Sequence, residues 1–259
     1  GGDFVVSGAN NIANAELGQK FNAEAGHFLL DSGSFIDTTG GSAKNGGDIT
    51  IRTIIRSSSL QAGTDGNIDI KGNLTTNGGV ATSIGRAGGS VTLTAGLDTD
   101  GASGFDGATG NTNGKITIFT GADISTIGSN ATGAGDSNGG ACGAVTLDTN
   151  GGANGTITLT DTSILTGGGT KVNNGAAGAG GTITISDPLL ISTSSNSKAT
   201  LLDTGSAVAG NVTISGTIDG VTESGTALQD HLDIISGTGA VDLGGVIGGS
   251  VALTTLDIN

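Results

Sequence analysis

The most regular feature of the chain is a five-residue phrase in which Gly and one further residue precede an apolar–polar–apolar triplet. Such alternation is typical of a short β-strand that buries its two apolar side chains and exposes the middle one. Ten copies occur, and their first apolar residues lie at positions 49, 68, 91, 116, 145, 157, 183, 212, 241 and 251. Repetition of a strand-sized unit predicts a solenoid, in which successive turns stack on one another.

The spacing of the copies indicates how long each turn is. Most separations are 19–29 residues, which suits one turn of a solenoid. The copies at 145 and 157, and those at 241 and 251, lie much closer together and indicate a second strand within a turn. Weaker strand-like segments, such as Phe35-Ile36-Asp37-Thr38 and Ser163-Ile164-Leu165-Thr166, lie between copies and precede loops of Gly, Ala, Asn and Ser. We therefore expect an all-β, right-handed parallel β-helix (β-solenoid) with Gly-rich loops. Roughly nine to twelve turns would give a rod on the order of 50 Å long.

The loops and the two ends of the chain depart from this regular pattern. The loops from Ala95 to Asn113 and from Gly128 to Gly140 are expected to project from one edge, and their small side chains would let backbones approach closely. Residues 1–34 predict an atypical N-terminal rung or cap, which leaves residues 35–259 as the solenoid. The last residues, 253–259, still have the pattern of a strand and contain no polar cap, charge cluster or helix. Because exposed strand edges must be covered, we expect continuation in a larger chain or end-to-end self-association.

Composition supports a β-structure with an aliphatic core. Gly supplies 52 of the 259 residues, there is a single Pro, and Thr, Ser, Asn and Asp are abundant. All of these are poor helix formers. The chain has six Phe but no Tyr or Trp, so its core must come from stacked Ile, Val and Leu.

The net charge and the single cysteine exclude several classes of function. The formal net charge is −14, and nine unclustered Lys and Arg cannot neutralise a nucleic acid, so no nucleic-acid partner is expected. No apolar run approaches the ~18–20 residues of a membrane span. Cys142 cannot form an intrachain disulfide, and we interpret it as a small buried residue just before a strand.

Residues that could carry catalysis are few. His231 lies between Asp230 and Asp233, and His27 is isolated; we interpret both as ordinary surface histidines. The segment Gly135-Asp136-Ser137-Asn138-Gly139 matches the Gly-x-Ser-x-Gly pattern of a nucleophile elbow, but no helix pattern follows it. We therefore expect no catalytic residues and no enzyme activity.

Three acidic residues are the candidate metal ligands. Asp98, Asp100 and Asp106 fall in one loop, where they are either solvated turn residues or ligands for calcium, which binds several oxygens. Calcium is the only cofactor that the sequence suggests. The same cluster could instead serve a carbohydrate-active β-helix enzyme, which needs grouped carboxylates.

A column of outward threonines offers a further alternative. The middle residues of seven phrases are Thr, at positions 50, 92, 117, 146, 158, 184 and 213. Flat Thr arrays on β-solenoids occur in ice-binding proteins, whereas strand propensity alone also favours Thr at exposed positions. Asp48, Asn67, Lys115 and Asn211 interrupt such a face with polar and charged groups.

The Gly-led Val/Ile-Thr-Leu/Ile phrases, separated by Gly/Ala/Asn/Ser loops, resemble the β-strand repeats of filamentous-haemagglutinin-like adhesins and autotransporter passenger domains. The resemblance covers residues 35–259 and implies a secreted, non-enzymatic surface protein of bacteria that serves adhesion or builds fibres. We therefore expect an extracellular structural or adhesive β-solenoid at the cell surface, forming a rigid spacer or filament segment. Surface glycans or cell-surface receptors are the partners that the resemblance implies. A carbohydrate-active enzyme and an ice- or calcium-binding solenoid remain the alternatives.

Overall fold

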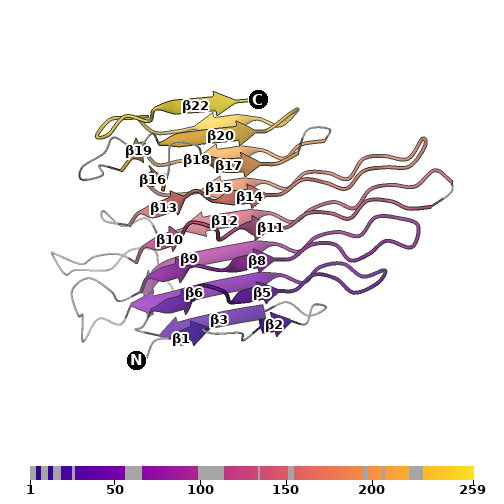
Figure 1. The fold of residues 1–259 in the computed structure, drawn as a ribbon, viewed down its shortest axis with the longest axis horizontal. Coiled ribbons are helices and arrows are strands. Elements are labelled where there is room, and N and C mark those ends of the chain that lie inside the picture. Colours follow the sequence, from indigo (N-terminus) through magenta and orange to yellow (C-terminus); the bar gives the residue numbers. More distant parts are fainter. Residues whose placement is uncertain are drawn as a thin grey trace.

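The computed structural model describes residues 4–6, 11–13, 19–24, 27–55, 66–98, 114–133, 135–150, 155–194, 198–205, 208–221 and 230–259. These residues form β-strands and turns without any helix, and every pairing between their strands is parallel (Figure 1). The expected all-β parallel β-helix is therefore confirmed. None of the described segments is a helix that could cross a membrane.

The strands belong to three sheets, named A, B and C. Sheet A contains β1 (Phe4–Val6), β4 (Phe28–Leu30), β7 (Ile68–Ile70), β10 (Ile116–Ile118), β13 (Ile157–Thr160), β16 (Leu189–Ser192) and β19 (Ile218–Gly220). Sheet B contains β2 (Asn11–Ala13), β5 (Phe35–Asp37), β8 (Asn73–Thr75), β11 (Ile124–Ser125), β14 (Ser163–Leu165), β17 (Thr200–Asp203), β20 (His231–Ile235) and β22 (Thr255–Ile258). Sheet C contains β3 (Gln19–Glu24), β6 (Ile49–Ile55), β9 (Val91–Asp98), β12 (Val145–Asp148), β15 (Ile183–Ile185), β18 (Val212–Ile214) and β21 (Val241–Leu243). Three consecutive strands, one in each sheet, make one turn.

Most turns are longer than the sequence prediction. The strands of sheet A from β4 onward begin at positions 28, 68, 116, 157, 189 and 218, and the interval between two of these positions is one turn. The predicted turn length was wrong because the Gly-led phrase occurs in both sheet C and sheet A of the same turn. Seven turns and β22 of an eighth are present, which at ~4.8 Å per turn gives roughly 35 Å rather than 50 Å.

The core is a stack of aliphatic side chains inside the three sheets. In the phrase of β12, Val145 and Leu147 are fully buried while Thr146 between them is partly exposed, as the alternation predicts. The register stacks similar side chains on one another: Leu147 pairs with Leu93 of the preceding turn and with Ile185 of the next turn. Every turn thus buries its aliphatic residues against those of the neighbouring turns, which supplies the main stabilisation of a solenoid.

A buried threonine fixes the corner between sheets B and C in five consecutive turns. Thr126, for example, follows β11, and its hydroxyl donates to the carbonyl oxygen of Gly143 at 2.8 Å, while the Gly143 N–H donates back to the Thr126 carbonyl at 3.2 Å. The same hydroxyl-to-glycine bond, 2.5 to 2.8 Å long, is made by Thr38, Thr76, Thr126, Thr166 and Thr204. Each bond joins the two ends of a loop, so long insertions at this corner leave the strands in register.

The described strands within residues 1–34 belong to the same three sheets. They are β1, β2, β3 and β4, and β1 to β3 pair in parallel with the strands of the next turn. The backbone of these strands therefore continues the stack at the N-terminal end of the molecule (Figure 1).

Candidate functional site

The loops between sheets B and C form a layer that projects from one edge of the solenoid (Figure 1). We call this the loop layer; it comprises residues 39–46, 77–88, 127–142, 167–180 and 205–209, apart from 134, 206 and 207, which the structure does not describe. Within it, the N–H of Gly128 and of Ala131 donate to the carbonyls of Gly167 and Thr170 in the next turn, at 3.2 and 2.9 Å. The same three-residue step recurs where Gly139 and Cys142 donate to Ala176 and Ala179. A step of three residues is typical of extended threefold helices, which have no internal hydrogen bonds.

Glycine permits this packing because the backbones lie in direct contact. A Cβ atom on Gly140 would lie 2.0 Å from the carbonyl oxygen of Arg86, and one on Gly178 would lie 1.8 Å from that of Gly140. Such distances exclude any side chain. The expectation that small residues let these backbones approach closely is confirmed for the described loops.

The two long loops named in the sequence prediction connect different sheets. Residues 128–140 lie in the loop layer, whereas the chain from Ala95 to Asn113 starts within β9 of sheet C and leads to β10 of sheet A. The two segments therefore join different pairs of sheets, which the sequence alone could not show. Residues 99–113 lie outside the described part, so the direction in which that loop projects stays a prediction.

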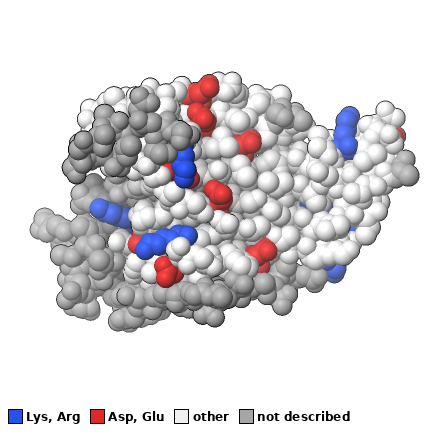
Figure 2. Space-filling view, viewed as in Figure 1, with Lys and Arg blue, Asp and Glu red and all other residues white. Residues whose placement is uncertain are grey.

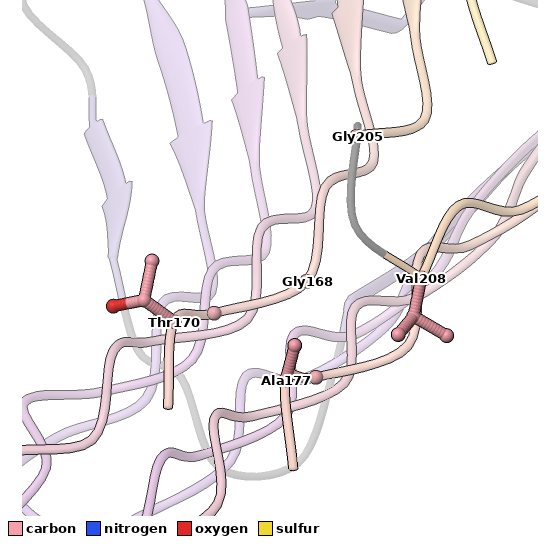
Figure 3. A pocket seen from close by; sticks show the side chains of 7 residues that line it. Gly168, Thr170, Ala177, Gly205 and Val208 are labelled. Carbon is pink, nitrogen blue, oxygen red and sulfur yellow. The ribbon is translucent and has the colours of Figure 1, made fainter. Parts of the chain in front are cut away.

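The loop layer ends in an open groove on its C-terminal side. The long loop of turn five, residues 167–180, is followed in turn six by the short segment 205–209. The space between the two arms of the long loop encloses about 180 Å³ and is lined by four glycines together with Thr170, Ala177 and Val208 (Figure 3). Figure 3 shows Thr170 on one arm and Ala177 on the other, with Gly205 and Val208 at the inner end.

The loop layer differs in charge from the rest of the chain. It contains Lys44, Arg86 and Lys171 but only one acidic residue, Asp136, which gives a formal charge of +2 against −16 for the remainder. On the face shown in Figure 2, acidic side chains are spread over the sheets and are not gathered in one patch. The loop layer therefore repels an acidic partner less than the remainder of the chain does.

Many Asp and Asn side chains link one turn to the next. The Oδ1 atom of Asp48 accepts the N–H of Ser90 at 2.7 Å, and Oδ1 of Asp123 accepts that of Ser163 at 2.9 Å. The same bond, 2.7 to 3.1 Å long, is made by Asn45, Asp48, Asn67, Asn73, Asp123, Asn130, Asp136, Asn138, Asn211 and Asp219. These side chains satisfy backbone donors at strand ends and within the loop layer, where no backbone carbonyl pairs with them.

The calcium prediction lies largely outside the described residues. Asp98 is the last residue of β9 and its side chain is not described, and Asp100 and Asp106 lie outside the described part. Within the described part, no group of three or more His, Cys, Asp and Glu is placed to hold a metal ion. Calcium binding by Asp98, Asp100 and Asp106 therefore stays a prediction.

The structure does not bring the histidines together. Nε2 of His27, just before β4, lies 3.1 Å from Oδ2 of Asp69 on the outer face of sheet A, whereas His231 begins β20 in sheet B. Ser137 of the Gly-x-Ser-x-Gly match is buried in the loop layer, where its backbone forms a bridge with Val172. The segment around Ser137 is an arm of the loop layer, which differs from the strand–turn–helix context of a nucleophile elbow.

Cys142 lies at the base of a loop-layer arm, shortly before β12. Its Sγ donates to the carbonyl oxygen of Thr166, and burial raises the pKa of the thiol to about 11, against a smaller lowering by the N–H groups of Gly181 and Cys142 itself. Little thiolate therefore exists at neutral pH, and the residue acts as a small packing group.

The predicted threonine column is divided between two sheets. Thr50, Thr92, Thr146, Thr184 and Thr213 lie in register on sheet C. Thr117 and Thr158 belong to sheet A. The exposed side chains of Asp48 and Arg52 flank the column on sheet C, and ice binding stays an untested alternative.

Asp148 and Asp187 form a carboxyl pair at the end of β12. Asp187 is 5% exposed and its Oδ2 accepts the N–H of Thr149 at 2.6 Å. Burial raises the pKa of Asp148 above its usual 3.8, the N–H of Asn150 opposes this, and the charge and hydrogen bond of Asp187 add to the increase.

The raised pKa of Asp148 predicts a pH-dependent stability. An acid whose pKa is higher in the folded state binds protons more tightly there than in the unfolded chain. Its protonation therefore stabilises the fold fully below about pH 3.8, the usual pKa, and this stabilisation is lost as the pH rises through the folded pKa. We expect Asp148→Asn to remove this loss, so that the melting temperature of the variant exceeds that of the natural chain at pH 7 but not at pH 3. Calorimetric scans of both proteins between pH 3 and 7 measure it, and parallel pH profiles would contradict the coupling of the pair.

Comparison with known proteins identifies no relative: no protein-family model, no curated protein and no solved structure matches the chain.

Proposed function

We propose that the chain is a non-enzymatic, extracellular structural or adhesive solenoid that acts as a rigid spacer or filament segment at the bacterial surface. The observation that carries this proposal is the partial exposure of aliphatic side chains in the last described turns of the stack. Inward aliphatic residues of the earlier turns are fully buried, whereas Val241, Leu243, Leu253 and Leu256 of the last turns are only partly buried. The sequence resemblance to filamentous-haemagglutinin-like adhesins supports the extracellular location.

The last described turns present apolar side chains and, in sheets B and C, open strand edges. Val246, Ile247 and Ile258 are 63%, 40% and 47% exposed. β22 and β21 are the outermost described strands of sheets B and C on this side, whereas β19 of sheet A is already covered by residues 246–251, which hydrogen-bond to Ile218 and Gly220. Further turns, from a longer chain or from the first turn of a second copy, would bury these side chains and continue the sheets. Because the contact between two copies joins two different ends, it generates an open filament.

Lysine in the last described turns tests this assembly. We expect the natural chain to form rods whose length increases with protein concentration, and Val246→Lys with Ile258→Lys to keep it monomeric, because two buried unpaired charges would oppose docking. Sedimentation velocity and negative-stain electron microscopy measure the two states.

The matched control places the same charges on apolar residues away from the end. Val80 and Ile84 lie in the loop layer and are 74% and 53% exposed. Val80→Lys with Ile84→Lys should assemble like the natural chain. Compact, monodisperse particles of the natural chain at every concentration would refute end-to-end assembly.

A further inference from the structure

The groove at the end of the loop layer exposes hydrogen-bond donors that are paired in the preceding turn. In turn four, the carbonyls of residues 127, 138 and 141 accept from turn three, and the N–H groups one residue later donate to turn five. By the same register, turn five directs the N–H groups of Gly168, Lys171, Ala177 and Gly180 towards turn six. Gly180 donates to the carbonyl of Val208, whereas the other three N–H groups form no hydrogen bond within the described chain. The groove thus lacks one further extended arm.

The packing of the existing arms defines what such an arm must contain. Gly175, Gly178 and Gly181 recur at three-residue spacing in the return arm of the turn-five loop, and all three are buried. A Cβ atom on any of them would lie 1.8 to 2.1 Å from a carbonyl oxygen of turn four. An occupant that packs as the return arm does would offer carbonyl groups every third residue and carry Gly at every third position.

One segment of the sequence meets this requirement and lies outside the described residues. Gly101, Gly104, Gly107 and Gly110 form the longest run of glycines at three-residue spacing in the chain. Asp100 precedes this run and Asp106 lies within it, and no basic residue accompanies them. The charge of the segment is complementary to that of Lys171, whose side chain is exposed beside the groove.

We propose that the groove between the arms of residues 167–180 binds the segment Gly101–Gly110 of a second copy of this chain. In this interaction the carbonyls of the segment accept the N–H groups of Gly168, Lys171 and Ala177, and its glycines face the arms, as in strand addition to an open sheet edge. The segment leads from sheet C to sheet A, whereas the groove belongs to the edge between sheets B and C, so the contact joins two solenoids side by side. It does not depend on the end-to-end assembly proposed above.

A synthetic peptide of residues 99–112 tests the proposal on the intact protein. We expect saturable changes in the amide resonances of Gly168, Lys171 and Ala177 in ¹⁵N spectra, with slower hydrogen exchange at these three groups. The same peptide with Gly104→Val and Gly107→Val should bind at least tenfold more weakly, because it keeps length and charge but cannot approach the arms. No saturable change at millimolar peptide, equal binding of the valine peptide, or changes confined to other residues would each overturn the assignment.

Protein variants separate this contact from the other assembly. Lys171→Glu should weaken peptide binding, whereas Lys44→Glu, in the turn-two loop of the same layer, should not. Val246→Lys with Ile258→Lys should bind the peptide like the natural chain even though end-to-end assembly is lost. For the full chain, Gly104→Val with Gly107→Val should abolish side-by-side pairs in electron micrographs but preserve the length of single rods, and unchanged pairing would overturn the choice of a second copy as the source.

Discussion

Replacing Gly140 by alanine is expected to lower the melting temperature of the protein by roughly 6–12 °C, which corresponds to about 3 kcal/mol. The new Cβ would lie 2.0 Å from the carbonyl oxygen and 2.4 Å from the carbonyl carbon of Arg86, and backbone atoms cannot move aside as a flexible side chain can. Gly140 also donates to Ser129 and accepts from Gly169, at 2.9 and 2.8 Å, so any shift disturbs three arms. Differential scanning calorimetry of the purified variant measures the effect.

Gly135 is the matched control in the same loop. A Cβ there meets nothing within 4 Å and the residue is exposed, so Gly135→Ala should change the melting temperature by less than about 2 °C. Equal melting temperatures of the two variants would show that the loop layer is not packed as a backbone-to-backbone array.

The second large effect is expected in the aliphatic core. Leu147→Ala should destabilise the protein by about 3 kcal/mol, because Leu147 is fully buried between Leu93 and Ile185 and its loss leaves a cavity. The neighbouring substitution, Thr146→Ala, should cost less than about 1 kcal/mol, because that side chain points outward. Denaturant unfolding monitored by circular dichroism compares the two.

Comparing Thr146 with Leu147 tests which face of the strand is buried. A shift of one residue exchanges the two faces of a strand, so a larger loss for Thr146→Ala than for Leu147→Ala would contradict the observed register. Because each turn of a solenoid contacts only its neighbours, both substitutions in turn four act on the centre of the stack, where fraying of the ends has least influence.

Sequence reasoning could identify the strands but could not count the turns. The phrase Gly143-Ala144-Val145-Thr146-Leu147 belongs to sheet C, and Gly155-Thr156-Ile157-Thr158-Leu159, which follows closely, belongs to sheet A. Both phrases satisfy the same local rule, with two residues inward and one outward. Which sheet a phrase joins depends on the residues stacked above and below it, and these are remote in the sequence: Val145 pairs with Val91 and Ile183.

The groove could be predicted from the sequence only in part. The glycine-rich loops indicated that backbones could approach closely, but the three-residue spacing of Gly175, Gly178 and Gly181 was the specific signal for the arms. The buried threonines were not recognised, because Thr126 inside the corner and Thr146 on the outer face have the same local surroundings of alternating residues. Their roles depend on whether a glycine carbonyl of the same turn lies within hydrogen-bond reach.

The sequence by itself determined the strand type, the inward and outward faces of each strand, the aliphatic core and the parallel stacking, since these follow from alternation between neighbouring residues and from repetition of one unit. The tertiary structure alone decided the number of turns, the threonine corners, the loop layer and the groove at its end. These features arise from contacts between residues tens of positions apart. Because the loops differ in length, these contacts do not recur at a fixed period in the sequence.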